Sequence, residues 1–130
     1  MKPAQASIYR VTERLLLWAV PIVERLPKSL PYQVMGRKII EDIEESLDLI
    51  TLALQSDSGD GRLQLLDLLT VRMTSVRTHF RILSELKALS LNQHAAYLEF
   101  ATSIASQLGA WRKKTRETVA GTSHDQGYAK

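Results

Sequence analysis

Apolar residues recur along this chain at alternating spacings of three and four, in four separate stretches. This spacing places apolar side chains on one face of a helix, and it is incompatible with the period of two that strands need. The pattern therefore predicts four helices, over about residues 6–26, 33–55, 62–88 and 91–118. The residues that define the four faces run from Ile8 to Ile22, from Ile40 to Leu54, from Leu66 to Leu83 and from Tyr97 to Trp111.

Short segments rich in proline, serine and glycine separate these helices, with Ser90 and Gln93 in the spacing of a capping box before the last one. Short connections force each long helix to run back beside the one before it. We therefore predict an all-α fold, an antiparallel up-down-up-down four-helix bundle, in one domain of about residues 1–120. From Gly121 onward the sequence has no apolar face, which predicts a disordered tail over about residues 121–130.

Further apolar residues widen the stripes beyond a single seam, among them Leu17 and Val20 on the first helix, Leu52 on the second and Leu68 on the third. A monomeric bundle needs only about three apolar positions in seven. The excess favours an interface between copies of the chain, and a wide core is the alternative.

Composition narrows the function further. The 130 residues contain no cysteine, which excludes disulfides, thiolate nucleophiles and cysteine-based metal sites. No apolar run approaches the roughly 18 residues of a membrane span, and the N-terminal residues do not resemble a secretory signal. We expect a soluble, cytoplasmic protein without a membrane partner.

The net charge of +3 is unevenly distributed. Residues 36–61 hold two basic and seven acidic residues, whereas the other three helical segments are each net basic. Around the second stripe, the carboxylates from Glu41 to Asp48 are expected to form a solvated face.

The chain lacks the patterns that would indicate catalysis. His79, His94 and His124 are not spaced as metal ligands, and Ser58-Gly59-Asp60-Gly61-Arg62 lacks the lysine of a phosphate-binding loop. We therefore predict no catalytic residue, no metal site and no cofactor.

Basic residues are spaced more regularly. Arg77 and Arg81 lie four apart, as do Arg10 and Arg14, and a cluster near the predicted end of the fourth helix contains Arg112, Lys113, Lys114 and Arg116. Such arrays neutralise the phosphates of nucleic acid. Purely structural roles fit the same residues equally well, because cations near a helix C-terminus offset its dipole and the arginines of the third helix can pair with carboxylates of the second.

Several of these features occur in an order that resembles a known family. Pro21 precedes the turn at Pro27-Lys28, Gly36-Arg37 leads into the acidic helix, and the third helix carries its arginine pair before the closing Leu108-Gly109-Ala110-Trp111. From about Ile8 to Lys114 the chain resembles the accessory variability determinant (Avd) proteins of diversity-generating retroelements. More broadly, it is similar to the four helix bundle family that includes ribosomal RNA intervening-sequence proteins.

The resemblance implies a homopentamer that binds a reverse transcriptase and its RNA or DNA, and that supports mutagenic cDNA synthesis without being an enzyme. It carries over Arg77 and Arg81 as contact residues. The alternative within the same family is a protein of the ribosomal intervening-sequence type, which binds RNA or protein without a retroelement.

Overall fold

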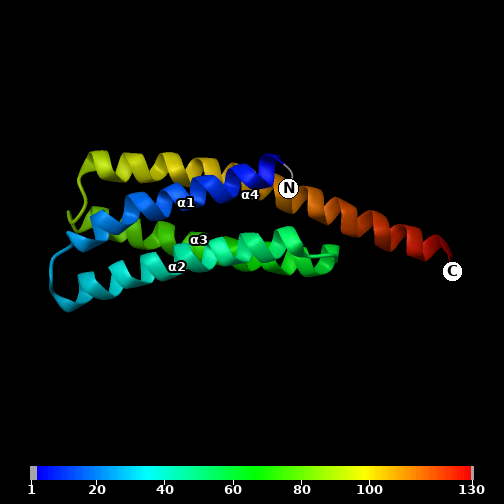
Figure 1. Cartoon of the computed structure of the whole chain (residues 1–130), viewed down its shortest axis with the longest axis horizontal. Helices are drawn as coiled ribbons and strands as arrows, with labels where there is room; N and C mark the ends of the chain where they lie inside the picture. Colours follow the sequence, from blue (N-terminus) through cyan, green and yellow to red (C-terminus); the bar gives the residue numbers. More distant parts are fainter. Residues whose placement is uncertain (1–2, 130) are drawn as a thin grey trace.

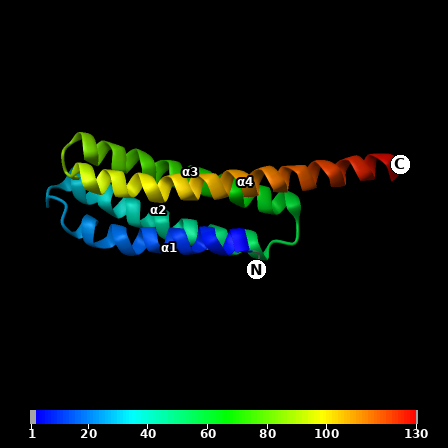
Figure 2. The same ribbon diagram turned by 90° about the horizontal axis from the view of Figure 1, so that it is seen from above.

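The computed structural model describes the backbone of residues 3–129 and the side chains of residues 8–121. It contains four α-helices and, within the described residues, no strand: α1 (Pro3–Glu24), α2 (Leu30–Gln55), α3 (Gly59–Glu85) and α4 (Leu91–Ala129). Each helix runs back beside its predecessor, which confirms the predicted all-α antiparallel four-helix bundle (Figure 1). The connections after α1 and α3 lie at one end of the bundle, and the α2–α3 connection lies at the other (Figures 1 and 2).

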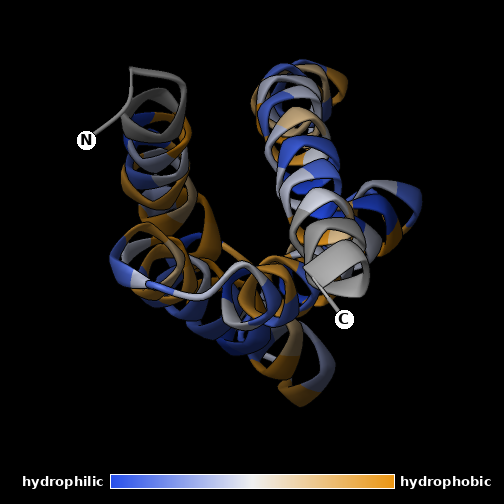
Figure 3. Ribbon diagram, turned by 90° about the vertical axis from the view of Figure 1, so that its right-hand side faces the viewer, coloured by the Kyte–Doolittle hydropathy of each residue, from blue (hydrophilic) through white to orange (hydrophobic). Residues whose placement is uncertain are grey.

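The core is built from the predicted stripes. Each helix carries both hydrophobic and hydrophilic residues (Figure 3), and the hydrophobic ones meet inside. An aromatic cluster joins three helices: the Phe80 ring stacks on Tyr97 with centroids 4.3 Å apart, and Trp18 lies 5.7 Å from Phe80 and 5.6 Å from Phe100. Such pairs contribute about 0.5–1.5 kcal/mol each beyond their burial.

A glycine allows two helices to pack closely, and short polar side chains cap the start of two others. A Cβ at Gly36 would lie 2.7 Å from Val23 Cγ1, so glycine is what lets α2 approach α1 closely. Ser58 Oγ accepts a hydrogen bond from the Gly61 amide at 3.1 Å, which starts α3 at Gly59, three residues earlier than predicted. The capping box before α4 is confirmed, because Ser90 N–H donates to Gln93 Oε1 at 2.9 Å and Gln93 N–H donates to Ser90 Oγ at 3.0 Å.

The end of α3 has a feature that the sequence did not reveal. The Ala88 amide donates to the Leu83 carbonyl at 2.9 Å, and the Lys87 amide donates to the Ser84 carbonyl at 3.0 Å. These two bonds form a Schellman motif, in which the residue after the C-cap adopts a left-handed conformation. That residue is Lys87, with φ of 62°, where glycine is usual.

Helix α4 continues to Ala129, beyond the end near residue 118 that the pattern predicts. No proline interrupts residues 119–129, and a glycine within a helix lowers its stability by only about 1 kcal/mol. The far end of α4 projects past the rest of the bundle (Figure 2). The disordered tail expected for residues 121–130 stays a prediction, because the side chains beyond Gly121 lie outside the described residues.

The acidic face predicted on α2 needs one correction. Glu41, Glu44 and Asp48 are exposed, as expected, but Asp42 is only 1% exposed. Its carboxylate faces α3, where Arg72 Nη1 lies 3.7 Å away, and Lys38 Nζ lies 3.1 Å away on the same helix. Neither Asp42 oxygen has a partner of good hydrogen-bond geometry within the described residues, so these two cations are what compensate the buried charge.

Candidate nucleic-acid interface

The order of the helices around the bundle separates the charges. α1 and α3 each pack against both α2 and α4, whereas α2 and α4 make no contact with each other in the described part of the chain. α2 and α4 therefore lie diagonally opposite, and the exposed carboxylates of α2 point away from α4. The basic residues that the sequence singled out all lie on α1, α3 or α4. They form one side of the molecule, which we call the α4 face: the outer surface of α4 with its borders on α1 and α3.

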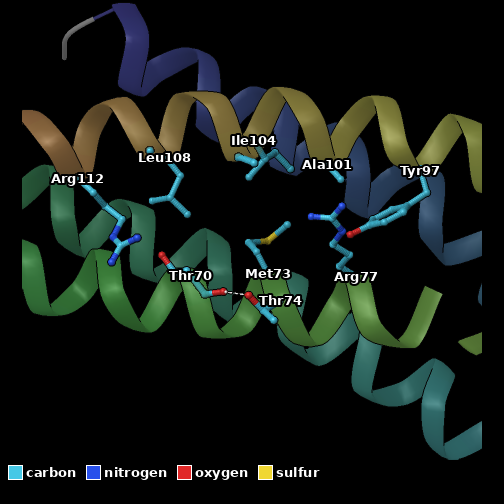
Figure 4. A pocket seen from close by; sticks show the side chains of 11 residues that line it. Thr70, Met73, Thr74, Arg77, Tyr97, Ala101, Ile104, Leu108 and Arg112 are labelled. Carbon is cyan, nitrogen blue, oxygen red and sulfur yellow. Dashed lines mark hydrogen bonds between the residues drawn. The ribbon is translucent and has the colours of Figure 1, made fainter. Parts of the chain in front are cut away.

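A groove of about 160 Å³ runs between α3 and α4 on this face. Arg77 of α3 stands at one end of the groove and Arg112 of α4 at the other, with Met73, Ile104 and Leu108 between them (Figure 4). Arg77 and Arg112 belong to two separate basic clusters in the sequence, and helix packing brings both clusters to one groove.

Arg77 has a free positive charge. No carboxylate lies within 4 Å of it among the described side chains. It points toward Tyr97, whose hydroxyl lies on the opposite wall of the groove (Figure 4). Burial raises the pKa of Tyr97 to about 12, and the nearby Arg77 guanidinium lowers that pKa by a smaller amount. Tyr97 is therefore a neutral hydroxyl at physiological pH, and Arg77 is available for an anion.

The other two arginines of the groove region are already paired. Arg112 donates to Asp67 Oδ1 through Nε at 3.1 Å and through Nη2 at 2.8 Å. Arg81, one turn beyond Arg77, lies 3.4 Å from Glu85 in an exposed pair. Exposed pairs contribute at most about 1 kcal/mol, so a phosphate can replace Glu85 at Arg81 more easily than it can replace Asp67 at Arg112.

Three small residues form part of the α4 wall of the groove, beside the larger Tyr97, Ile104 and Leu108. Ala101, Ala105 and Gly109 follow one another at intervals of four, so they lie along one side of the helix. A Cβ at Gly109 would meet nothing within 4 Å, which means that this part of the wall is open. The surface is therefore smooth enough for an extended backbone to lie close to α4.

The opposite border of the α4 face carries the remaining predicted residues. Arg10 and Arg14 are exposed on α1, and Arg14 lines a second groove, between α1 and α4. Lys113, Lys114 and Arg116 are exposed on α4 beyond both grooves. The structure thus places Arg77 and Arg112 in one groove and Arg14 in the other, and it brings Arg10, Arg81 and the exposed cations of α4 to the borders of the same face.

Arg112 and Arg81 have structural partners in Asp67 and Glu85, but the two structural roles expected from the sequence are not the ones that the cations adopt. Arg112 to Arg116 lie more than three turns before the end of α4, too far to offset its dipole. The arginine that reaches the carboxylates of α2 is Arg72, with Nε 3.1 Å from Glu45 Oε2, and neither Arg77 nor Arg81 does so. The residue spacing does not predict this role for Arg72, because its partners Asp42 and Glu45 lie on another helix and are identified only once α2 and α3 pack together.

Metal binding and membrane insertion are two further properties that the described residues address. No group of three or more histidine, aspartate or glutamate side chains in this part of the chain is placed to hold a metal ion. None of the helices, as far as they are described, combines the length and the apolar character that crossing a membrane requires.

The fold and the site together define an all-α bundle with acidic and basic sides. No protein-family model, no curated protein and no solved structure matches the chain.

Proposed function

We propose that this chain is a non-catalytic accessory subunit of a diversity-generating retroelement, which binds the reverse transcriptase and its RNA or DNA to support mutagenic cDNA synthesis. The observation that carries the proposal is the separation of charge across the bundle. The cations border α4 on both sides, and the acidic helix lies diagonally opposite. A strand of nucleic acid that follows α4 meets positive charge on either side and avoids the carboxylates of α2.

Phosphate neutralisation is the physical basis of the proposed binding. Lysine and arginine at phosphates release condensed counterions, which gives affinity without sequence specificity. This suits an accessory subunit that must hold a template or cDNA of any sequence while another chain performs polymerisation. Arg77 is the principal contact, because its charge has no partner among the described side chains, and Arg81 extends the same row by one turn.

Self-assembly belongs to the same proposal. Leu17 is 70% exposed on α1, and Leu52 and Leu68 are each 49% exposed on α2 and α3. Leu52 lies on α2, diagonal to α4, and Leu68 lies on the side of α3 opposite Arg77, so subunits can associate through these two residues and leave the basic surface open, whereas Leu17 lies on the same side of α1 as Arg10 and Arg14. The family resemblance implies a homopentamer, and light scattering measures its mass directly.

Charge reversal of the arginine pair tests the proposal. The variant Arg77→Glu/Arg81→Glu is compared with Arg25→Glu/Arg37→Glu, which changes the net charge equally at two exposed arginines, one in the α1–α2 connection and one on α2. We expect the first variant to weaken capture of the retroelement's reverse transcriptase, or binding of its template RNA, by about tenfold or more. The control should stay near wild type, with equal helicity and mass in all three proteins.

If wild-type protein captures neither the polymerase nor the RNA at low salt, the proposal is wrong. The second candidate, a ribosomal intervening-sequence protein, is favoured by the same bundle and basic face. Gene context separates the two: a reverse transcriptase gene with template and variable repeats supports the first, and an intervening sequence within a ribosomal RNA gene supports the second.

A further inference from the structure

The groove between α1 and α4 differs in chemistry from the groove between α3 and α4. It is an open surface groove of about 430 Å³, and its walls include the half-buried aromatic rings of Trp18 and Phe100. Its polar groups are Arg14, Glu99 and Ser103. The volume falls within the range of small-molecule sites, which combine apolar walls with a few polar groups.

Trp18 and Phe100, the aromatic residues of this groove, belong to the aromatic cluster of the core. The Trp18 ring forms tilted pairs with two other rings, with centroids 5.6 Å from Phe100 and 5.7 Å from the fully buried Phe80. Phe80 in turn stacks on Tyr97. Trp18 is half-buried, packs against the core and also lines the groove, so part of its ring is available for a base to stack on.

The polar groups on the groove suit different parts of a nucleotide. Arg14 is exposed and carries the positive charge that a phosphate needs, and Arg10 extends this charge along the same face of α1. The Glu99 carboxylate only accepts hydrogen bonds, so it fits the amino group of a base and not a phosphate. The Ser103 hydroxyl both donates and accepts.

We infer that the α1–α4 groove binds an unpaired base of single-stranded nucleic acid, which stacks on Trp18 and Phe100 while Arg14 contacts the adjacent phosphate. The inference rests on the proposed nucleic-acid binding and specifies its substrate: a strand with accessible bases. Bases in a duplex are stacked on one another and cannot enter the groove. Stacking on aromatic side chains tolerates any base, and either sugar fits, so RNA and DNA single strands both qualify.

Charge favours this occupant over a second copy of the chain. Arg10 and Arg14 lie four apart on the α1 side of the groove and Glu99 lies on its α4 side, so cations exceed carboxylates there, and a second copy would bring the same excess of positive charge to the same place. A nucleic-acid strand brings phosphates, which these cations attract. The aromatic groove and the basic border then act on two parts of one ligand.

Intrinsic fluorescence can observe Trp18 directly. The chain has one other tryptophan, Trp111, which is only 7% exposed, and the variant Trp111→Phe leaves Trp18 as the sole tryptophan. The probes are labelled single strands of about 12 nucleotides, as RNA and as DNA, an abasic strand of equal length, and a duplex. Anisotropy of the label reports binding to the α4 face, and tryptophan emission reports the base.

We expect both single strands to quench Trp18 and to bind about tenfold tighter than the abasic strand, the factor that stacking of one base provides. Filling the groove with Ala96→Leu should remove the quenching and this tenfold advantage. The matched control Ala95→Leu, at the exposed position before it, should leave both within about twofold of wild type.

Equal affinity for the abasic strand without quenching would overturn the inference and leave the proposed phosphate binding intact. The same holds if Ala96→Leu and Ala95→Leu behave alike. Absence of any anisotropy change at low salt would refute nucleic-acid binding itself and this inference with it.

Discussion

The charge of Arg77 should appear in the salt dependence of nucleic-acid binding. The logarithm of the binding constant falls linearly with the logarithm of salt concentration, by about 0.7 for each phosphate neutralised on a single strand and about 0.9 on a duplex. Arg77 has no carboxylate partner among the described residues, so its full charge is available. The variant Arg77→Gln should therefore make the slope less negative by about 0.7 for a single strand.

Arg112 provides the internal comparison. Asp67 Oδ1 lies 2.8 Å from its Nη2 atom, so this guanidinium is largely neutralised before any phosphate arrives. Its removal in Arg112→Gln also leaves Asp67 unpaired, which adds a negative charge near the groove. We expect the Arg112→Gln variant to weaken binding at low salt but to change the slope by clearly less than the Arg77→Gln variant does.

The assay is fluorescence anisotropy of a labelled single strand, titrated at several salt concentrations between about 50 and 200 mM. Arg37→Gln is the matched control, because Arg37 is exposed on α2, the helix opposite α4. Equal changes of slope in Arg37→Gln and Arg77→Gln would show that binding follows net charge and not the α4 face. An unchanged slope in Arg77→Gln would remove Arg77 from the contact surface.

Three further predictions concern stability, each measured by urea unfolding. Arg72→Met should lower the free energy of unfolding by about 1–3 kcal/mol, because Lys38 still lies 3.1 Å from Asp42. Adding Lys38→Met leaves the buried carboxylate uncompensated and should raise the total loss to about 3–5 kcal/mol. A negligible loss in the double variant would contradict a buried charge at Asp42. The pKa of Tyr97 is about 12 in the folded chain and 10 when unfolded, so the unfolded state loses its proton first. The free energy of unfolding should therefore fall between pH 10 and pH 12 by up to about 3 kcal/mol, and this decrease should be absent from Tyr97→Phe. Lys87→Gly should stabilise the protein by about 1 kcal/mol because φ at this position is 62°, and a loss of stability would argue against the Schellman motif.

The sequence was sufficient to predict the architecture, because the helical period is strong in all four stretches and the connections are short. Residues such as Leu15, Ile43, Leu66 and Ile104, taken from the predicted stripes, are fully or almost fully buried. Boundaries were less accurate. The Ser58 cap was missed although serine is a preferred N-cap residue, whereas the left-handed Lys87 depends on backbone geometry that a lysine does not indicate.

Asp42 shows where a single-helix pattern fails. The apolar stripe of Ile40, Ile43 and Leu47 predicts that the whole acidic run of α2, including Asp42, faces solvent. The centre of the buried face is instead shifted toward α3, where Ile39, Asp42 and Ser46 are buried. That shift follows from which helix lies beside α2 and from Arg72 on it, neither of which is contained in the periodicity of α2 alone.

The candidate interface was predictable in its residues but not in its shape. A spacing of four places Arg77 and Arg81 on one side of α3, yet it does not say which helix borders that side. The pairing of Arg77 with Arg112 across one groove, and the aromatic groove beside Arg14, arise only when α4 packs between α1 and α3. The aromatic residues were recognised as core positions, and their partial exposure was not foreseen.

The separation of charge, in contrast, follows from topology once the bundle is accepted. In an up-down-up-down ring, consecutive helices are neighbours and the first helix closes onto the fourth, so the second and fourth helices must be diagonal. Of the three helices other than α4, α2 is the one that does not border α4. An acidic segment on α2 therefore keeps its carboxylates off both borders of α4. Had the acidic run stood on the first or third helix, it would have bordered α4 and opposed Arg112 to Arg116. The position of the acidic segment in the sequence therefore keeps its carboxylates away from both grooves beside α4, while Arg77 and Arg112 line one groove and Arg14 lines the other, which favours nucleic-acid binding along this helix.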